Sequence, residues 1–391
     1  MPFGLRMSKS YDVIVAGAGP AGSAAAHECA RMGLKTLCIE EHGTIGYPVQ
    51  CAGLLSTAAF DGCRVSERSI LNRVSGARII SARGGSLCFD AGTTRAIVAD
   101  RGILDREMAE QAANAGAEFL LRTSVCGVRE DRVITRGVNG TVEIPYRILI
   151  AADGPRSTVA RLLGMERAKV FLAGIQADIV RESDPDLVEI YPDASPEFFG
   201  WSIPTSPTRA RIGLCARTGV PALFDAFSKK FPSSSSPHLV TGTIPLGVMP
   251  RTYGHRTLFS GDAAGFAKPT SGGGVYTGVR SARHAAAVAA LACEEDRFDD
   301  MFLAGYEQRW QEDFGRELTS GFRLFSMRQH MTEQDTDNLI RALNDPAIIR
   351  TIGEYGDMDR PSAVIKKLLL VPGIIRLVQP LFRAGLRSLF S

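Results

Sequence analysis

The sequence contains no run of 18 or more apolar residues, so no segment is predicted to span a membrane. Its first residues, MPFGLRM, lack the apolar stretch of a secretory signal peptide. The 45 lysines and arginines nearly balance the 42 aspartates and glutamates, and no basic stripe is interleaved with aromatic residues, so no nucleic-acid partner is expected. We expect a cytoplasmic globular protein whose 391 residues suffice for two or three domains.

The eight cysteines form no CxxC pair and no cluster with histidine, which argues against a zinc site or an iron–sulfur cluster, and no metal site is predicted. Their scatter also gives no dense disulfide framework, so a reducing compartment is expected. They stand at Cys29, Cys38, Cys51, Cys63, Cys88, Cys126, Cys215 and Cys293.

The segment YDVIVAGAGPAGSAAAHECARMGLKTLCIEE has the pattern of a buried strand, a glycine turn, an alanine-rich helix and a second strand. Gly17, Gly19 and Gly22 give the G-x-G-x-x-G spacing at the first junction, where glycines permit a tight turn, approach of a pyrophosphate, and close helix–strand packing. Glu40 follows about 20 residues later, where an acid can accept ribose hydroxyls, with Glu41 as the neighbouring option. These features together predict a dinucleotide-binding fold.

The stretch GDAAGFAKPTSGGG (261–274) has more glycine than any regular element tolerates, so bare backbone is needed there. A long alanine-rich helix follows it. Further upstream, residues 100–120 form a predicted helix with Arg101 at its entry, and a later strand ends in AADGPRS (151–157). This order of elements resembles the glutathione-reductase-type FAD domain, in particular its para-hydroxybenzoate-hydroxylase-like branch.

The resemblance implies FAD as the cofactor. It places Asp153 near the cofactor crevice, Asp262 on the ribityl and pyrophosphate side, and the amides of the late glycines against the N1–C2=O edge of the flavin, where a helix N-terminus favours negative charge. The implied cofactor-binding residues are Gly17, Ala18, Gly19, Ala21, Gly22, Glu40, Cys51, Ala52, Gly53, Arg101, Cys126, Asp153, Asp262, Gly273, Gly274 and Val275.

Three segments resemble the geranylgeranyl reductase family more narrowly. GYPVQCAGLLS (46–56) is similar to its P-x-x-C-x-G segment, FFGWSIPTSPTRARIGL (198–214) to its aromatic Y-x-W-x-F-P segment, and GDAAGFAKPTSGGGVYTG to its GDAAG…P-T-x-GGG segment. The resemblance implies an FAD-dependent reductase that saturates C=C bonds of geranylgeranyl chains in archaeal-type membrane glycerophospholipids.

An unactivated alkene has no polar group that a protein can bind, so such a reaction depends on holding the chain against the flavin in an apolar tunnel. Phe198, Phe199 and Trp201 are the candidate substrate wall, although an aromatic cluster is also ordinary core packing. Cys51 and Tyr276 are candidate proton donors; for Cys51, packing or flavin contact is the preferred interpretation, because nothing nearby visibly activates the thiol.

The strand and helix patterns divide the chain into three parts. A discontinuous Rossmann-like FAD domain is expected over 8–74, 100–165 and 251–296, an inserted antiparallel-sheet substrate domain over 75–99 and 166–250, and a helical C-terminal region over 297–391. The whole is predicted to be an α/β fold.

The last 30 residues, 362–391, carry five basic residues and no acid, with apolar residues at helical spacing. This composition favours peripheral contact with the inner face of the cell membrane, the alternative being a helical pair that caps the core. The expected partners are a polyisoprenyl lipid and a reduced electron donor, with nicotinamide, deazaflavin and ferredoxin all left open. A flavin monooxygenase or halogenase and a membrane-associated flavoprotein electron carrier are the alternative functions.

Overall fold

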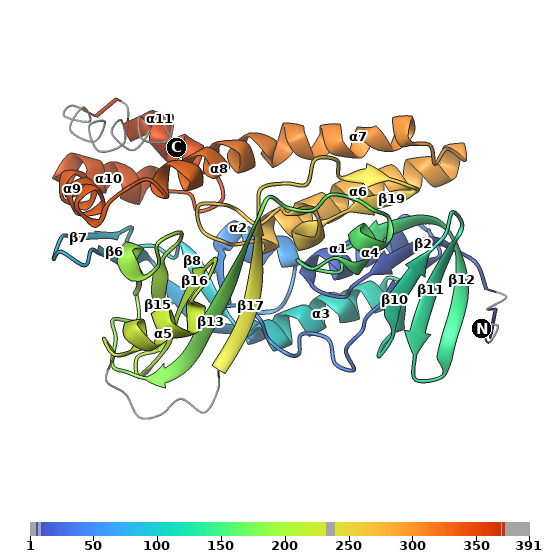
Figure 1. Ribbon diagram of the computed structural model, residues 1–391, viewed down its shortest axis with the longest axis horizontal. Coiled ribbons are helices and arrows are strands. Elements are labelled where there is room, and N and C mark those ends of the chain that lie inside the picture. The colour runs from blue at the N-terminus through green and yellow to red at the C-terminus, as the bar shows by residue number, and fades with distance from the viewer. Residues whose placement is uncertain (1–4, 7–8, 232–238, 369, 372–391) are drawn as a thin grey trace.

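The computed structural model describes residues 5–6, 9–231, 239–368 and 370–371. A mainly parallel sheet lies at one end of the molecule and a seven-stranded sheet at the other, while the C-terminal helices run along one side of both (Figure 1). The predicted fold class, an α/β protein with a Rossmann-like domain, an added antiparallel sheet and C-terminal helices, is confirmed.

The parallel sheet has the strand order β9-β3-β2-β12-β19. The long strand β12 belongs to both the antiparallel and the parallel part of this sheet. Its first half pairs antiparallel with β11, and its second half pairs parallel with β2 and β19. The strands of this assembly are β1 (Leu5–Arg6), β2 (Tyr11–Ala16), β3 (Thr36–Ile39), β9 (Glu118–Leu120), β10 (Ser124–Val128), β11 (Arg132–Gly137), β12 (Gly140–Ala151), β18 (Tyr253–Gly254) and β19 (Thr257–Phe259).

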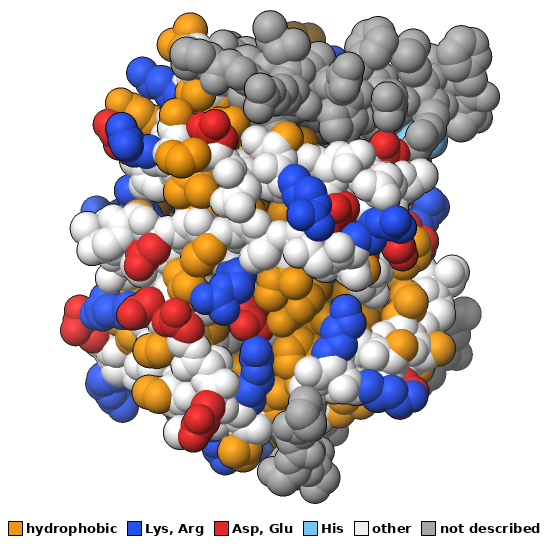
Figure 2. Space-filling view, turned by 90° about the vertical axis from the view of Figure 1, so that its left-hand side faces the viewer, with side chains coloured by type: hydrophobic (Ala, Val, Ile, Leu, Met, Phe, Trp, Pro, Cys, Tyr) orange, Lys and Arg blue, Asp and Glu red, His pale blue; other side chains and the backbone are white. Residues whose placement is uncertain are grey.

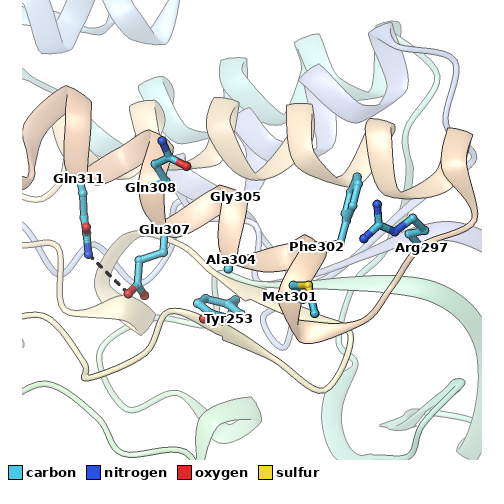
Figure 3. Close-up of a pocket in the computed structure, with 9 residues that line it drawn as sticks. All are labelled: Tyr253, Arg297, Met301, Phe302, Ala304, Gly305, Glu307, Gln308 and Gln311. Atoms are coloured by element: carbon cyan, nitrogen blue, oxygen red, sulfur yellow. Dashed lines mark hydrogen bonds between the residues drawn. The ribbon is translucent and has the colours of Figure 1, made fainter.

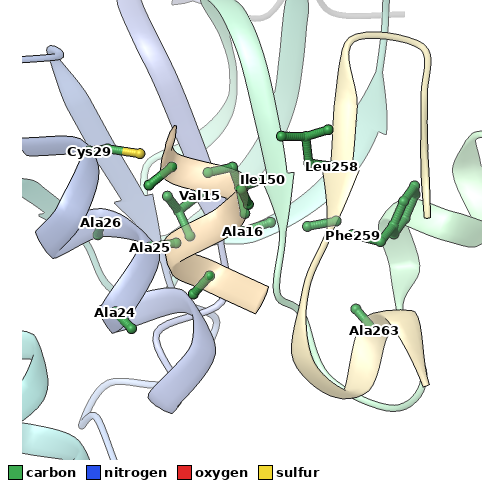
Figure 4. Close-up of a cluster of buried hydrophobic side chains, with 14 of the residues drawn as sticks. Val15, Ala16, Ala24, Ala25, Ala26, Cys29, Ile150, Leu258, Phe259 and Ala263 are labelled. Atoms are coloured by element: carbon green, nitrogen blue, oxygen red, sulfur yellow. The ribbon is translucent and has the colours of Figure 1, made fainter. Parts of the chain in front are cut away.

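Helices α1 (Pro20–Arg31) and α6 (Val275–Glu295) pack on each other beside this sheet, and α3 (Arg101–Asn114) packs on α1. Alanines on α1 and α6 keep the helices close, because a methyl group fills little of the space between two backbones. Figure 4 shows part of the resulting core, in which the small side chains of α1 lie against the apolar residues of β2, β12 and β19.

The seven-stranded sheet has the order β17-β13-β16-β15-β14-β6-β7. All its pairings are antiparallel except β14 with β6, which is parallel, so the predicted antiparallel sheet has one exception. Helix α5 (Val220–Ser228) covers β13 and β16. The strands are β6 (Gly76–Ile80), β7 (Ser86–Asp90), β13 (Val170–Val180), β14 (Leu187–Tyr191), β15 (Gly200–Ser206), β16 (Arg209–Ala216) and β17 (Leu239–Leu246).

A small third sheet, β4-β8-β5, contacts β15 of the seven-stranded sheet through β5 and β8, and helix α6 through β4. It consists of β4 (Leu54–Ser56), β5 (Ile70–Val74) and β8 (Ala96–Ala99), with helix α2 (Thr57–Cys63) directly after β4. Strand β8 lies inside the range 75–99 expected for the substrate sheet. The alternation of that range indicates strands but not their partners, and β8 pairs outside the seven-stranded sheet.

The C-terminal region is helical as far as the structure describes it, and within the described residues no helix is both long and apolar enough to cross a membrane. Most of the basic tail predicted for membrane contact, residues 369 and 372–391, lies outside the described residues. The helices are α7 (Asp300–Trp310), a π-helical turn (Gln311–Gly315), α8 (Arg316–Arg328), α9 (Glu333–Leu343), α10 (Pro346–Tyr355) and α11 (Pro361–Leu368).

Candidate active site

The first glycine turn connects β2 to α1. Two of its three glycines leave no room for a β-carbon, and the third does. Gly17 has a φ of +95°, and a β-carbon there would lie 2.4 Å from the carbonyl oxygen of Ala152. At Gly22 a β-carbon would lie only 1.8 Å from the carbonyl oxygen of Gly17. At Gly19, in contrast, a β-carbon would meet no atom within 4 Å. Two glycines therefore serve packing, and the third faces open space at the N-terminus of α1, where a pyrophosphate would lie.

Glu40 follows β3 and points back to this turn. Its Oε2 accepts a hydrogen bond from the Ala18 N–H at 2.8 Å, and its Oε1 accepts one from the His42 N–H at 2.9 Å. Glu41 is exposed. Since side chains alternate along an extended chain, only one of the two acids predicted for this position can face the turn, and it is Glu40.

The late Gly-Asp motif lies against the first turn, although about 240 residues of sequence separate them. Gly261 and Asp262 begin a short 3-10 helix (Gly261–Ala264) after β19, and a β-carbon at Gly261 would lie 2.8 Å from the Ala21 β-carbon. On the other side, a β-carbon at Gly274 would lie 2.6 Å from Asp262 Oδ1, so this carboxylate faces the start of α6.

Asp262 lies in an unfavourable place for a charge, since within the described residues no side chain forms a hydrogen bond or ion pair with its carboxylate. Burial raises the pKa of its carboxyl to about 6, although the positive charge of Arg101 opposes the shift. Arg101 is the first residue of α3 and binds Asp105 through two hydrogen bonds of 2.8 and 2.9 Å. Burial lowers the pKa of the Arg101 guanidinium, but Asp105 outweighs this effect and the net shift is upward.

The loop that carries Cys51 is fastened to the seven-stranded sheet. Gln176 on β13 donates to the Cys51 carbonyl at 3.0 Å, and Arg211 on β16 donates to the Ala52 carbonyl at 2.9 Å. Gly53 has a φ of +79°, and its N–H donates to the Cys51 sulfur at 3.4 Å. The predicted cofactor residues Cys51, Ala52 and Gly53 therefore lie on a loop that the seven-stranded sheet holds in place.

The predicted aromatic wall lies next to the glycine loop 272–274. Phe198 is buried and stacks on Phe199 with ring centroids 4.2 Å apart, and Trp201 packs edge-on to Phe199 at 6.3 Å. A β-carbon at Gly272 would lie 3.4 Å from the Phe198 ring. These rings belong to an apolar cluster between the sheet and α8, which contributes Phe325. The aromatic segment and the glycine loop thus share one apolar space.

The remaining predicted residues lie at various points around this arrangement. Asp153 follows β12 and accepts hydrogen bonds from the Ser157 hydroxyl at 2.7 Å and the Val159 N–H at 2.9 Å, at the start of α4 (Thr158–Leu162), whose N-cap is Ser157. Cys126 lies on β10, at an irregularity in the pairing with β11. Val275 begins α6, and the Tyr276 ring lies under Arg280, 5.6 Å from the guanidinium.

Sequence reasoning missed five residues that hold the site together: Ser56, Gln176, Arg211, Lys268 and Asp359. Lys268 belongs to the motif AKPTSGGG, which was the one available signal for it. Ser56 and Arg211 lie in the quoted segments 46–56 and 198–214, whereas Gln176 and Asp359 lie outside every quoted segment and contact them only through the tertiary fold, at separations of 91 to 303 residues. No local pattern distinguishes them.

A separate hollow of about 540 Å³ lies on the outer side of α7 (Figure 3). It is lined by residues of α7 and its surroundings, with Gln311 donating to Glu307 at 3.4 Å. None of its nine lining residues belongs to the predicted site.

In sequence and in structure, this chain is similar to several known proteins. Residues 10–218 match the family described as FAD binding domain. The chain is 31% identical to a digeranylgeranylglycerophospholipid reductase of Methanothermobacter thermautotrophicus, over 90% of this chain and 98% of the relative. It superposes on the crystal structure of a geranylgeranyl bacteriochlorophyll reductase-like protein of Thermoplasma acidophilum with a TM-score of 0.85 and 25% identity, covering 95% and 99% of the two chains. A flavin-dependent halogenase at 16% identity and a TM-score of 0.69, covering 98% of this chain and 78% of that one, shares the fold alone.

The chain is an FAD-binding oxidoreductase, since the matched domain, the open space at Gly19 and the carboxylates of Glu40 and Asp262 all suit this cofactor. Within that class it belongs to the family of the digeranylgeranylglycerophospholipid reductases. The predicted cofactor and the predicted family are both confirmed.

Proposed function

We propose that this protein saturates C=C bonds in the geranylgeranyl chains of membrane glycerophospholipids. The observation that carries the proposal is the meeting of the apolar aromatic wall with the glycine loop, where Phe198 lies 3.4 Å from the position of a Gly272 β-carbon. A polyisoprenyl chain offers only apolar surface for recognition, and this wall offers aromatic and aliphatic side chains in return. The names of the relatives support the same substrate class.

The residues of the site have distinct roles in this proposal. The turn at Gly17–Gly22 holds the pyrophosphate of FAD, Glu40 the adenosine ribose, and Asp262 the ribityl chain. The amides at Gly273 and Gly274 would hold the flavin ring, and the Cys51 loop would be a further contact with it. Reduced FAD, when bound, supplies a hydride equivalent, and the protein contributes by holding the alkene in place and excluding water. Positioning of this kind is worth several kcal/mol of the barrier.

The anaerobic reaction of the reduced protein with its lipid tests the function. The FAD-loaded protein is reduced, excess reductant is removed, and a glycerophospholipid with geranylgeranyl chains is added while absorbance and lipid mass are followed. We expect the flavin to reoxidise without oxygen and the lipid to gain two mass units for each double bond. Flavin that stays reduced until oxygen is admitted would contradict the proposal and favour the monooxygenase alternative.

Replacing Cys51 by alanine is expected to reduce turnover by less than about tenfold, because the sulfur is engaged by the loop's own N–H at Gly53. A proton donor would be worth roughly 10²- to 10⁴-fold. The measurement is single-turnover reoxidation of the reduced variant by lipid, with Cys51→Ser as the matched control. A loss above a hundredfold in Cys51→Ala, partly restored in Cys51→Ser, would instead assign proton donation to the thiol.

Peripheral membrane contact forms the second part of the proposal. On the face in Figure 2, hydrophobic side chains gather at the centre of the surface with lysine and arginine side chains around them. On α11, Ile365 and the basic pair Lys366–Lys367 are exposed. Basic and apolar groups side by side suit an anionic lipid surface, from which the substrate must be drawn.

Deletion of residues 369–391 is expected to lower binding to anionic vesicles at least tenfold, because it removes the basic residues Arg376, Arg383 and Arg387. Vesicle flotation at low and high salt measures the effect, and neutral vesicles serve as the control. Equal flotation of the full and shortened chains would remove the tail from the proposal.

A further inference from the structure

A buried ion pair joins the C-terminal region to two motifs of the active site. Lys268, in the segment before the glycine loop, donates to Asp359 and also to the Met358 carbonyl at 3.0 Å. Ser56, which caps α2, donates to the other oxygen of the Asp359 carboxylate. The side chains of Lys268 and Asp359 are only 8% and 2% exposed, so both charges lie out of reach of bulk water.

The lysine is an integral part of the glycine loop. Its N–H donates to the Gly273 carbonyl at 3.0 Å, and its own carbonyl accepts from Gly272 at 2.7 Å. A β-carbon at Gly273 would lie 3.4 Å from Lys268 Cε and 3.7 Å from Lys268 Nζ. The ammonium group is therefore beside the backbone at the start of α6, where the helix dipole is already positive.

This placement is costly if its only purpose is to hold the loop. Removing two charges from water costs several kcal/mol per ion, and well-packed apolar side chains usually hold a structure at least as well as a buried ion pair. Arg280 and Asp313, joined by hydrogen bonds of 2.6 and 2.7 Å, already tie α6 to the π-helical turn that precedes α8. A buried charge next to a cofactor has a second effect, because it acts on the cofactor through a medium that screens weakly.

We propose that the Lys268–Asp359 pair sets the reduction potential of the bound FAD. Reduction would add negative charge to the flavin ring, and the ammonium beside Gly273 would stabilise that charge, while the paired carboxylate of Asp359 would limit the effect. The proposal rests on the flavin contact assigned above to Gly273 and Gly274. It does not depend on which lipid is reduced.

The test is the midpoint potential of the FAD-loaded protein, measured by equilibration with a redox dye, for Lys268→Met and Asp359→Asn. Loss of the positive charge is expected to lower the ratio of reduced to oxidised flavin about tenfold at a fixed ambient potential, and loss of the negative charge to raise it about tenfold. Asp359→Asn keeps a side chain of the same shape, so this variant remains informative if Lys268→Met does not fold.

Asp337→Asn is the matched control, because Asp337 is also a buried carboxylate bound by a serine, Ser81, and a cation, Arg341. It lies on α9 against β7, at the opposite end of the molecule from the parallel sheet (Figure 1), and its loss should leave the potential unchanged. Shifts of the same sign in Lys268→Met and Asp359→Asn, or no shift in Asp359→Asn, would overturn the proposal and leave the pair a structural role. Because no lipid is present, the result is independent of the reductase assay.

Discussion

Replacing Gly22 with alanine is expected to abolish FAD binding and to lower the thermal stability of the protein. The added β-carbon would lie 1.8 Å from the Gly17 carbonyl oxygen; the first is fixed to the α-carbon of α1 and the second belongs to the backbone of the turn, so neither can move without separating α1 from the turn. Absorbance of the purified protein near 450 nm measures bound FAD, and thermal unfolding of the FAD-free protein measures stability. Normal flavin content in this variant would show that the turn is formed differently.

Gly19→Ala is the matched variant, since it makes the same chemical change three residues away with the opposite structural consequence. Gly19 has an extended conformation (φ −68°, ψ −177°) that alanine adopts without strain, and its β-carbon would contact nothing within 4 Å. The FAD-free variant should therefore be as stable as the parent. Its affinity for FAD should fall about a hundredfold, because the methyl group would occupy the space of the pyrophosphate. Parent-like affinity would contradict the assignment of that space.

The features that could be predicted from the sequence are those that depend on residues close together along the chain. The glycine spacing at Gly17–Gly22, the acid at Glu40 and the glycine-rich start of α6 each combine a local conformation with a chemical need, so a short pattern identifies them. The fold class followed from the same patterns, because a strand, a glycine turn and a helix in that order restrict the topology strongly.

What sequence could not predict depends on distant contacts. Gln176 lies 125 residues from Cys51, and Asp359 lies 91 residues from Lys268, so each is an ordinary polar residue until the fold brings it to its partner. The parallel pairing of β14 with β6 and the placement of β8 in the small sheet have the same cause. Alternating apolar residues indicate which face of a strand is buried, but they do not identify the neighbouring strand.

Asp262→Asn is expected to stabilise the FAD-free protein against unfolding and, at the same time, to weaken its binding of FAD. Burial raises the pKa of Asp262 to about 6, so above that pH the FAD-free protein carries a partly buried charge that is better solvated in the unfolded chain. From the rise of the pKa from 3.8 to about 6, the neutral side chain should stabilise the FAD-free protein by up to about 3 kcal/mol at pH 7.5. FAD affinity should fall roughly tenfold, because an amide is a weaker acceptor than a carboxylate for a ribityl hydroxyl.

The pH dependence gives the sign of this effect. A carboxyl group whose pKa is raised in the folded state costs no stability below the ordinary pKa of aspartate, where it is protonated in both states. As the pH rises from about 4 to about 6, the unfolded chain loses its proton first, and the FAD-free parent loses stability relative to Asp262→Asn. Denaturant unfolding of both FAD-free proteins should therefore give equal free energies near pH 4 and a difference at pH 7.5. A constant difference across this range would mean that the pKa of Asp262 is the same in the folded and unfolded chains, and that the carboxylate is solvated in the folded protein.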